Sequence, residues 1–366
     1  MKKILLSCGG TGGHIYPAIA IASKIKEHQP DAEILFIGTK KGMENRLVPD
    51  AGFEIKGIDA SGLNRTSIVK NVKTLENMIH GSRDAAAIIK DFAPDAAIGT
   101  GGYVTWTVIS QAHRAGIPCY IHEQNAVPGL TNKMLQTVAD KVFISFEESA
   151  SSFRHREKTV FTGNPIRAQF TGLNKAECRK SLGIADDEKF ILLFGGSLGA
   201  EVLNEACLRL IGEMPDSGMR LYFVTGKRYY EEIAKRIKEE GLEKPCVTLL
   251  DYADNMPVLM KASDLVISRA GAIALSEILA CARPSVLVPS PNVTNNHQYY
   301  NAKAASDAGA SLLIEEKDIT EDLSRFSKAV LALAEDDERL GAMSVNASAI
   351  AVTDAAERIY RELGLE

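Results

Sequence analysis

The sequence predicts an α/β protein of two domains, each a parallel β-sheet with helices on both faces. Its 366 residues exceed the roughly 100–200 residues of a common domain, so two domains are expected. Short apolar runs alternate with helix-length segments along the whole chain, which is typical of such sheets. A glycine-rich turn after the first apolar run recurs near the middle of the chain. A hydrophobic fraction of 45% and a charged fraction of 24% exclude a disordered chain.

The first half contains five apolar runs that we expect to be buried strands. They are Lys3–Leu6, Ile34–Ile37, Ala96–Ile98, Cys119–Ile121 and Val142–Ile144. Between the first two runs, Ile15–His28 carries apolar residues at helical spacing. Pro17 would then lie in the first turn of a helix, where proline is tolerated.

The second half repeats this plan. Its expected strands are Phe190–Phe194, Leu221–Val224, Val247–Leu250, Leu265–Ser268, Ser285–Val288 and Ser311–Ile314. Its expected helices are Leu203–Gly212, Tyr230–Glu240, Ile273–Ala282 and Gln298–Ala308, followed by almost continuous helix over Glu321–Glu366.

The recurring glycine turn indicates an internal duplication. Gly9-Gly10-Thr11 and Gly195-Gly196-Ser197 each follow an apolar run and stand 186 residues apart, close to half the chain length. The simplest interpretation is two Rossmann-like domains in tandem, 1–164 and 165–340, with the break near Thr162–Leu173. We expect a C-terminal helical segment, 341–366, to pack back on the first domain.

Charge and cysteine content exclude several classes of protein. Residues 1–164 carry 19 Lys and Arg against 16 Asp and Glu (+3), whereas residues 165–366 carry 23 against 31 (−8). Without a Lys/Arg block, nucleic acid is not an expected partner. The six cysteines are scattered singly, so neither a zinc site nor a redox motif is indicated. The apolar run Ile4–Leu6 is too short for a signal peptide and no stretch is long enough to span a membrane, so we expect a cytoplasmic protein.

The segment Gly9–His14 is the first candidate binding element. Glycines permit a tight turn and a close ligand approach, and the helix N-terminus that follows favours anions; a bare structural turn is the alternative. Dinucleotide binding is disfavoured, because the pattern is not GxGxxG and Lys40-Lys41 stand where a ribose-binding acid belongs. His14 can accept a proton from a substrate hydroxyl, or it can simply cap or line the pocket.

Two further polar clusters follow strands of the first half. Gly99–Thr105 is another glycine turn, and His122-Glu123-Gln124-Asn125 follows the next strand. Four consecutive polar residues are costly to bury unless they bind something. Together with Gly9–His14, these segments place three loops at one edge of the first sheet.

Three segments of the second half resemble parts of a nucleotide-sugar site. Gly195-Gly196-Ser197 leads into a helix and suits a phosphate. Ser268–Glu277 is another strand-to-helix turn, in which Glu277 either accepts two hydrogen bonds from a ribose diol or is an ordinary solvated helical residue. Asn295-Asn296-His297-Gln298 either faces a sugar or caps the next helix. No His or carboxylate cluster has metal-ligand spacing, so we expect no metal and no cofactor.

The order of these motifs resembles the MurG family of bacterial N-acetylglucosaminyltransferases over essentially the whole chain. The matching segments are Gly9–His14 with Pro17, Gly99–Tyr103, His122–Asn125, Gly163–Arg167, Gly195–Ala200, Ser268–Glu277 and His297-Gln298 with Asn301-Ala302. The resemblance implies a GT-B fold, in which two Rossmann-like domains face a cleft. It also implies inverting transfer of GlcNAc from UDP-GlcNAc to the C4 hydroxyl of MurNAc in the undecaprenyl-linked lipid I, which gives lipid II for peptidoglycan synthesis.

The resemblance also implies roles for individual residues. His14 would be the general base, and Glu277 would contact the ribose. Gln298 would hold GlcNAc hydroxyls, whereas His297, where the family often has a second glutamine, is left open. The backbone of Ala253, a position usually occupied by isoleucine, would meet uracil. The other implied donor contacts are Ser197 and the turn Ala272, Ile273, Ala274, Leu275 and Ser276 with the phosphates, Arg167 with the nucleotide, and Thr11, Gly12, Gly13 and Asn125 with the donor sugar.

A lipid acceptor implies a peripheral protein at the inner face of the cell membrane. Ile68, Val72, Leu75 and Ile79 share one face of an expected helix, which suits either an anionic membrane surface or packing into the core. A UDP-GlcNAc 2-epimerase, a GT-B enzyme with a small soluble acceptor and a non-enzymatic nucleotide-sugar-binding module stay open as alternatives.

Overall fold

The chain divides into two compact units, each with a core of its own. The computed structural model describes residues 2–60, 68–196 and 199–365, without the side chains of residues 68–78. The first unit contains Met1–Arg167 together with Thr353–Glu366, and the second contains Ala168–Val352.

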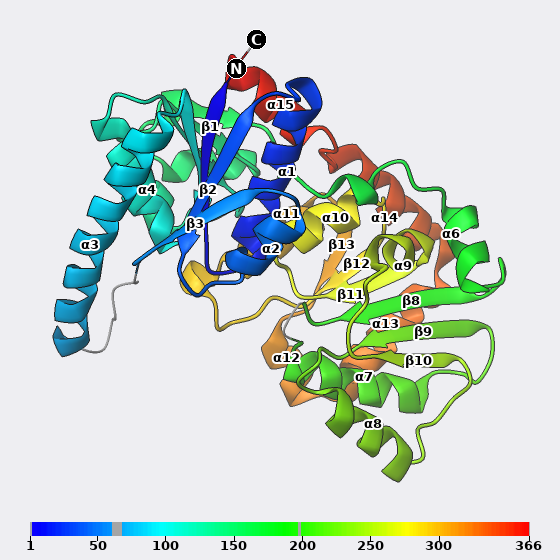
Figure 1. Cartoon of the computed structure of the whole chain (residues 1–366). Helices are drawn as coiled ribbons and strands as arrows, with labels where there is room; N and C mark the ends of the chain where they lie inside the picture. The colour runs from blue at the N-terminus through cyan, green and yellow to red at the C-terminus, as the bar shows by residue number, and fades with distance from the viewer. Residues whose placement is uncertain (1, 61–67, 197–198, 366) are drawn as a thin grey trace. The chain divides into compact units, whose positions relative to one another are not determined.

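The first unit is built on a parallel sheet whose strands, within the described residues, follow the order β3-β2-β1-β4-β5-β6-β7 (Figure 1). The strands are β1 (Lys3–Cys8), β2 (Glu33–Thr39), β3 (Glu54–Ile58), β4 (Ala96–Gly101), β5 (Cys119–Glu123), β6 (Lys141–Ile144) and β7 (Thr159–Phe161). Successive strands are added outward on either side of the β1/β4 pair. In open α/β sheets, ligands bind at the carboxyl ends of the strands beside such a switch point.

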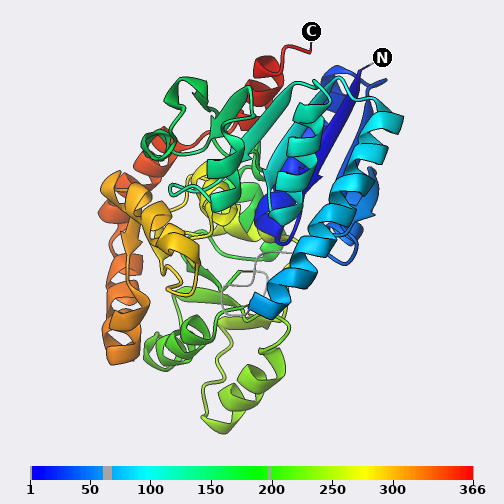
Figure 2. The same ribbon diagram turned by 90° about the vertical axis from the view of Figure 1, so that its left-hand side faces the viewer.

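Helices cover both faces of this sheet. On one face lies α1 (Gly12–His28), and on the other α3 (Ile68–Phe92) and α4 (Tyr103–Arg114) pack beside one another (Figure 2). Ile4 and Leu6 of β1 belong to the core under α1, whereas Leu5 belongs to the core under α4. Alternate residues of a strand point to opposite faces, so a strand covered on both sides is apolar throughout. The shorter elements are α2 (Glu44–Asp50), α5 (Leu130–Leu135), η1 (Glu147–Ser152) and η2 (Arg156–Lys158).

The second unit repeats this topology with the strand order β10-β9-β8-β11-β12-β13. Its strands are β8 (Lys189–Phe194), β9 (Met219–Val224), β10 (Val247–Leu250), β11 (Leu265–Ser268), β12 (Ser285–Leu287) and β13 (Ser311–Leu313). Its helices are η3 (Ala168–Phe170), α6 (Lys175–Leu182), α7 (Glu201–Glu213), α8 (Tyr230–Glu239), α9 (Met256–Ala262), α10 (Ala272–Ala280), η4 (Thr294–Asn296), α11 (His297–Asp307), α12 (Glu316–Glu321), α13 (Leu323–Glu335) and α14 (Asp337–Ile350). The pair β8/β11 corresponds to β1/β4, so the predicted duplication and the two Rossmann-like domains are confirmed.

An aspartate braces the amino ends of central strands in both units. Each of these aspartates stands directly before a strand and pairs with one residue at the start of the neighbouring strand. The backbone N–H of the aspartate donates to the carbonyl of this partner residue, and the backbone N–H of the partner donates to the carboxylate of the aspartate. These bonds measure 2.7–2.8 Å. The pairs are Asp95 with Lys3, Asp140 with Cys119, and Asp264 with Phe190. The equivalent pairs β1/β4 and β8/β11 are therefore fixed in register by the same interaction.

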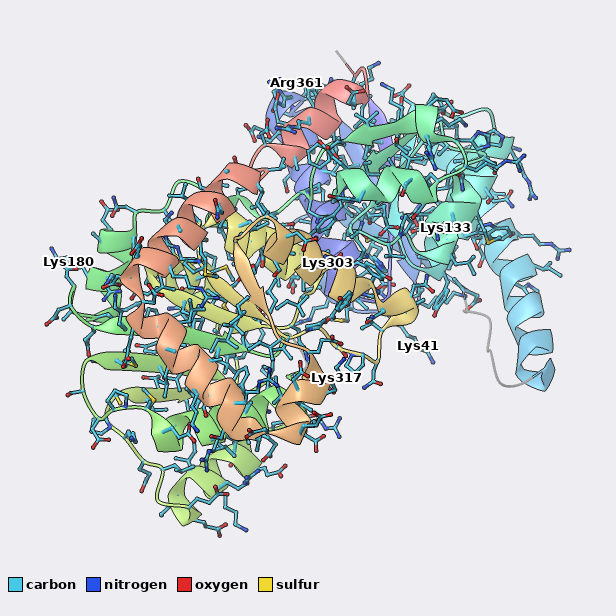
Figure 3. The ribbon with its side chains drawn as sticks, turned by 180° about the vertical axis from the view of Figure 1, so that it is seen from behind. Lys41, Lys133, Lys180, Lys303, Lys317 and Arg361 are labelled. Carbon is cyan, nitrogen blue, oxygen red and sulfur yellow. The ribbon has the colours of Figure 1, made fainter. Side chains whose placement is uncertain are left out.

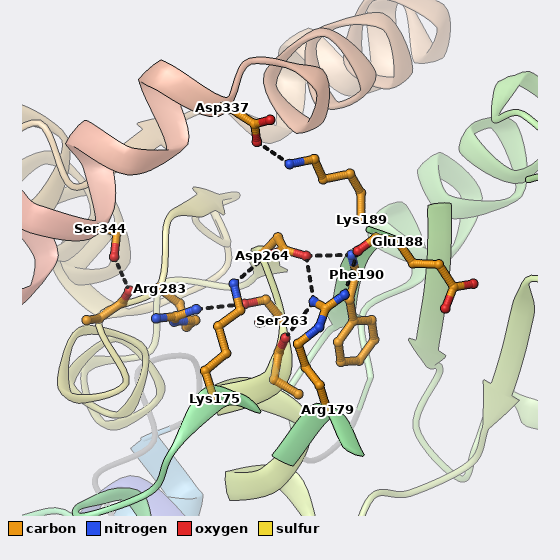
Figure 4. Close-up of polar contacts among 12 residues, drawn as sticks. Lys175, Arg179, Glu188, Lys189, Phe190, Ser263, Asp264, Arg283, Asp337 and Ser344 are labelled. Atoms are coloured by element: carbon orange, nitrogen blue, oxygen red, sulfur yellow. Dashed lines mark hydrogen bonds and ion pairs between the residues drawn. The ribbon is translucent and has the colours of Figure 1, made fainter. Parts of the chain in front are cut away.

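Asp264 also gathers two cations from α6 (Figure 4). Lys175 Nζ donates to its Oδ1 at 2.5 Å, and Arg179 Nη1 donates to its Oδ2 at 3.0 Å. Burial raises the pKa of the Asp264 carboxyl, but the hydrogen bonds from Lys175 and from the Phe190 backbone outweigh burial and hold this pKa below its usual range. The ionised carboxylate therefore ties α6, the first α-helix of the second unit, to its sheet.

The C-terminal segment corrects one predicted boundary. Helix α14 belongs to the second unit, where Ser344 Oγ donates to the Ala282 carbonyl at 2.8 Å, so residues 341–352 do not join the first. Only α15 (Ala355–Glu362) and the residues around it return to the first unit, where α15 packs against α1; Arg361 marks this helix in Figure 3. The rings of His28 and Tyr360 stack with their centroids 4.2 Å apart.

Two strands and one proline position differ from the sequence-based expectation. The structure adds β3 and β7, both edge strands that are mostly only partly buried, so they lack the continuous apolar run that identifies central strands. Helix α1 begins at Gly12, which places Pro17 in the second turn instead of the first. Because proline has no N–H, the Gly13 carbonyl there lacks its usual helical donor.

The helix expected over Ile68–Ile79 is present as the first half of α3. Since the side chains of residues 68–78 lie outside the description, its apolar face stays a prediction; Ile79 itself is 49% exposed. In the described part of the chain, no helix has both the length and the apolar character needed to cross a bilayer.

We expect Asp264→Asn to destabilise the second unit by about 1–3 kcal/mol, because a neutral amide cannot serve both cations and the Phe190 N–H. Hydrogen exchange of the full chain should quicken in β8 and β11. Since the folded-state pKa of Asp264 is depressed, its contribution is present above about pH 4 and is lost as the pH falls through the folded value.

The matched control for this prediction is Asp337→Asn. Asp337 pairs with Lys189 but is 77% exposed, so its removal should change exchange little. Identical exchange of β8 and β11 in Asp264→Asn and in the unchanged chain at neutral pH would contradict the bracing role.

Candidate active site

Three polar loops meet at the carboxyl edge of the first sheet. Gly9–Thr11 follows β1, Gly102 follows β4, and Gln124-Asn125 follows β5. Strand β4 lies between β1 and β5 in a parallel sheet, so the carboxyl ends of all three lie at the same edge. The predicted convergence of these motifs is confirmed.

His14 lies in the first turn of α1 at this edge. Its Nδ1 lies 3.0 Å from the Gly9 carbonyl oxygen, and its own carbonyl accepts a hydrogen bond from Thr100 Oγ1 at 2.7 Å. Gly101 has a φ of 121°, and a Cβ there would come within 2.6 Å of His14 Cδ2. The Gly101 backbone therefore lies against the imidazole ring. Because a carbonyl only accepts hydrogen bonds, the contact with Gly9 assigns the proton to Nδ1 and leaves a lone pair on Nε2.

A second histidine, His122, lies fully buried behind this edge. Its Nε2 donates to the Gly163 carbonyl at 3.1 Å, and its Nδ1 accepts from Gln124 Nε2 at 2.9 Å. Gln124 also donates to the Thr100 carbonyl at 2.7 Å. Burial lowers the pKa of His122 to about 4 and proximity to His14 adds to this, against a smaller opposing effect of the Gly163 bond. His122 is therefore a neutral part of the scaffold at physiological pH.

Glu123 organises the loop that carries Asn125. It is 2% exposed, and its carboxylate accepts from the Gly129 N–H and Asn132 Nδ2, both at 2.9 Å. The backbone N–H and the side-chain amide of Asn125 donate to its other oxygen at 3.0 and 3.2 Å. Of the polar run 122–125, three side chains are thus buried and satisfied within the unit, and only that of Asn125 is partly exposed. The run was expected to bind something, yet most of it serves as scaffold.

Sequence reasoning missed Glu44, the first residue of α2. Its side chain is fully buried, and Oε1 accepts from the backbone N–H and Oγ1 of Thr39 at 2.9 and 2.6 Å. Its Oε2 accepts from the Gly10 N–H at 3.4 Å. A Cβ at Gly38 or Gly42 would come within 2.6 or 2.1 Å of the Glu44 side chain. The only sequence signal was an acid two residues after a glycine, shortly after a strand, which is too common to identify such a residue.

The remaining predicted residues of the first unit surround the start of α1. Thr11 and Gly13 are exposed and Gly12 is partly buried. The guanidinium of Arg167 lies 5.1 Å from the centre of the Tyr16 ring, which holds the end of the linker against α1.

The second unit presents a helix N-terminus at the equivalent edge. Helix α10 begins after Gly271 with no side-chain cap, so the N–H groups of its first turn, Ala272 to Ala274, have no partner within the helix. Ile273 and Leu275 are buried, and Ser276 Oγ donates back to the Ala272 carbonyl at 2.9 Å. Glu277 is only 6% exposed, so it is not the solvated helical residue of the alternative interpretation.

The other predicted donor residues lie on loops of the same unit. Gln298 Oε1 accepts from the Ser290 N–H at 2.9 Å, which positions the start of α11. His297 Nδ1 lies 2.8 Å from the Thr294 carbonyl, a local contact within its own turn. Ala253 is buried in the loop after β10. Ser197 lies outside the described residues. A pocket of about 330 Å³ beside α11 is lined by Pro289, Pro291, Asn296, Tyr299, Glu315, Glu316, Lys317 and Thr320.

The possible metal ligands and the cysteines are distributed as follows. Within residues 2–60, 68–196 and 199–365, no three His, Cys, Asp or Glu side chains are grouped as metal ligands. All six cysteines are free and buried, and burial raises the pKa of Cys119 to about 12, as expected of unreactive structural thiols.

Comparisons with known proteins give one consistent result. Residues 4–144 match the Glycosyltransferase family 28 N-terminal domain, and residues 190–359 match the Glycosyltransferase family 28 C-terminal domain. A curated protein of Acetivibrio thermocellus is 45% identical over 98% of this chain and 96% of its own length. One of Clostridioides difficile is 42% identical over 99% of this chain and 88% of its own. Both are named UDP-N-acetylglucosamine--N-acetylmuramyl-(pentapeptide) pyrophosphoryl-undecaprenol N-acetylglucosamine transferase.

Solved structures agree on the fold. The crystal structure of Acinetobacter baumannii MurG superposes with a TM-score of 0.79 at 27% identity, and the match covers 100% of both chains. A UDP-GlcNAc 2-epimerase of Neisseria meningitidis, bound to UDP-GlcNAc, reaches a TM-score of 0.71 at 15% identity, also over 100% of both chains. The second likeness, at so low an identity, speaks for the shared fold alone.

The buried neutral His122 predicts a loss of stability in mild acid. Between about pH 6.5 and 4 the unfolded chain protonates this histidine whereas the folded chain does not, so stability should fall by up to about 3 kcal/mol as the pH drops. The protection of β5 amides against hydrogen exchange, measured across this range, should show that fall. His122→Gln should lack it, and the exposed His113→Gln should retain it. The same pH dependence in all three proteins would refute the assignment.

Proposed function

The chain belongs to glycosyltransferase family 28, and on this premise we propose that it transfers GlcNAc from UDP-GlcNAc to the C4 hydroxyl of MurNAc in lipid I, giving lipid II. Relatives 40–45% identical to it over 98–99% of its length bear the name of this transferase. The structural observation that carries the chemistry is His14, which holds its proton on Nδ1 and a lone pair on Nε2.

The acceptor is activated by His14. As O4 of MurNAc attacks the anomeric carbon from the face opposite UDP, Nε2 takes the hydroxyl proton, and attack from that face inverts the anomeric configuration. The Gly9 carbonyl holds the Nδ1 proton and so keeps the ring in the basic tautomer. Thr11, Gly12, Gly13 and Asn125 contact the donor sugar in this proposal.

The second unit binds the donor. The N–H groups of Ala272, Ile273 and Ala274, which have no partner within their helix, and the dipole of α10 meet the negative charge that grows on the departing diphosphate. The buried carboxylate of Glu277 accepts the ribose hydroxyls, and Gln298 donates its amide to GlcNAc. We assign the remaining donor contacts as the resemblance implies: Ser197, Leu275 and Ser276 to the phosphates, Ala253 to uracil and Arg167 to the nucleotide.

A lipid-linked acceptor requires the protein to work at the inner face of the cell membrane. We propose peripheral attachment through the first half of α3. Its apolar sequence positions and the +3 charge of residues 1–164 support attraction to an anionic leaflet. The wider role would be in peptidoglycan synthesis, and through it in cell shape and division.

The decisive experiment measures transfer of radiolabelled GlcNAc from UDP-GlcNAc to a lipid I analogue, with and without EDTA. We expect product in both conditions, because a helix N-terminus and hydroxyl donors, instead of a metal, neutralise the leaving group. Formation of UDP-ManNAc from UDP-GlcNAc alone, without transfer, would indicate an epimerase. Tight donor binding with neither product would indicate a binding module.

His14→Ala should reduce turnover by roughly 10²–10⁴-fold, the usual contribution of a general base. Donor affinity, measured by calorimetry with UDP-GlcNAc, should stay within about twofold. The exposed His113→Ala serves as the matched control and should behave as the unchanged protein. Turnover that survives the loss of His14 would remove it from the base role.

Glu277→Ala should raise the KM for UDP-GlcNAc by about 10–30-fold, since two hydrogen bonds to the ribose at about 1 kcal/mol each would be lost. Its kcat at saturating donor should change much less. Glu335→Ala, which removes an exposed acid of α13, is the control and should leave the KM unchanged. An unaltered donor KM in Glu277→Ala would exclude the ribose contact.

A further inference from the structure

The peptide group between Gly9 and Gly10 is hydrogen-bonded on both sides. Its carbonyl oxygen, on Gly9, lies 3.0 Å from His14 Nδ1. Its N–H, on Gly10, points to Glu44 Oε2 at 3.4 Å. One planar peptide therefore stands between a carboxylate and the imidazole of the catalytic base.

The carboxylate itself is unusual. Glu44 is 0% exposed, and among the described ion pairs none joins it to a Lys or Arg. Within the described residues, its hydrogen bonds come from Thr39 and the Gly10 N–H. Burying a carboxylate without a cation is strongly unfavourable, and a neutral side chain could bond Thr39 equally well. A structural role alone therefore does not explain why this buried position carries a carboxylate.

The surroundings are shaped to keep this carboxylate in place. A Cβ at Gly9 would come within 3.1 Å of Glu44 Oε1, and a Cβ at Gly38 or Gly42 would come so close to the Glu44 side chain that this side chain would have to move. The charge also acts on Cys8 at the end of β1. Burial is the larger cause that raises the pKa of the Cys8 thiol, and the negative charge of Glu44 is the smaller one. The Glu44 carboxylate thus lies against the glycine turn that precedes His14 and acts electrostatically on the residue before that turn.

We propose that Glu44 is a positioning residue for His14 and acts through the Gly9–Gly10 peptide, as the aspartate of a Ser-His-Asp triad acts by direct contact. The carboxylate polarises the Gly10 N–H, which makes the Gly9 carbonyl a stronger acceptor for Nδ1–H. This favours the tautomer with a free Nε2 and stabilises the imidazolium that forms during transfer. The inference rests on the proposed function for its catalytic consequence.

The step balances without moving the peptide proton. The O4–H bond of the acceptor breaks and its proton goes to Nε2, the O4–C1 bond forms, and the C1–O bond breaks so that UDP leaves with the electron pair. The positive charge stays on His14, with Nδ1–H still bonded to Gly9. The Nε2 proton is released to water afterwards.

His122 cannot supply this charge. It lies close enough to influence His14, but it is fully buried and neutral, and both of its ring nitrogens are occupied by Gly163 and Gln124. Gly101 at the end of β4 lies against the ring, and the Thr100 hydroxyl bonds to the His14 backbone carbonyl; both groups are uncharged. Glu44 on α2 is the charged group that the hydrogen bonds connect to His14.

The test is Glu44→Gln in the full chain, with two readouts. We expect kcat for GlcNAc transfer to fall about 10–100-fold, with the KM for UDP-GlcNAc within twofold. The titration of His14, followed by NMR of the labelled imidazole, should move to lower pH by about 0.5 unit or more, because the imidazolium loses its counter-charge. Glu54→Gln, an exposed acid of β3, is the matched control and should alter neither quantity.

Glu44→Asp is a second test variant, for the case that Glu44→Gln does not fold. It keeps the charge but withdraws it from the Gly10 N–H by one methylene, so it should give smaller changes in the same direction. A His14 titration that stays in place in the folded variants would overturn the inference, even if kcat falls, since a purely structural role would lower activity without moving it. The NMR readout does not require transfer, so an inactive unchanged protein would reject the proposed function separately.

Discussion

The register of the central strands depends on a single kind of hydrogen-bonded pair. An aspartate directly before β4, β6 or β11 exchanges hydrogen bonds in both directions with a residue at the start of the neighbouring strand. Parallel strands have no hairpin to set their alignment, so an interaction at the amino end has to do this. Once β1 and β4 are aligned in this way and β5 pairs with β4, the carboxyl ends of the three strands reach the same edge of the sheet. The three loops at Gly9–Thr11, Gly102 and Gln124-Asn125 then meet.

Buried carboxylates in the first unit serve the backbone. Glu123 accepts from the Gly129 N–H, from the Asn125 N–H and from two side-chain amides, and so orders the loop after β5. Glu44 accepts from Thr39 and Gly10 and lies under the turn after β1. Neither is paired with a cation in the described part of the unit. A loop of glycines has no side chains with which to hold its own shape, so a carboxylate beneath it supplies the missing hydrogen-bond partners.

The second unit uses its polar groups differently. At the amino edge, the carboxylate of Asp264 is surrounded by Lys175, Arg179 and a strand N–H, which lower its pKa despite burial. At the carboxyl edge, the first turn of α10 keeps its N–H groups unpaired within the helix. Although residues 165–366 carry a net charge of −8, these N–H groups favour an anion, because local backbone dipoles act at short range where the net charge of a domain is screened.

The sequence by itself determined the two-domain α/β fold, every central strand and the polar loops at the edge of the sheet where His14 lies. Continuous apolar runs and glycine turns are local patterns, and two halves with the same pattern have the same fold. It did not reveal the edge strands β3 and β7, because a half-buried strand lacks that apolar run. Only the tertiary structure decided that His122 is scaffold and that Glu44 lies beneath Gly9 and Gly10. Glu44 stands 34 residues from Gly10, and only the pairing of β1 with β2 brings them together, so no local pattern records their contact.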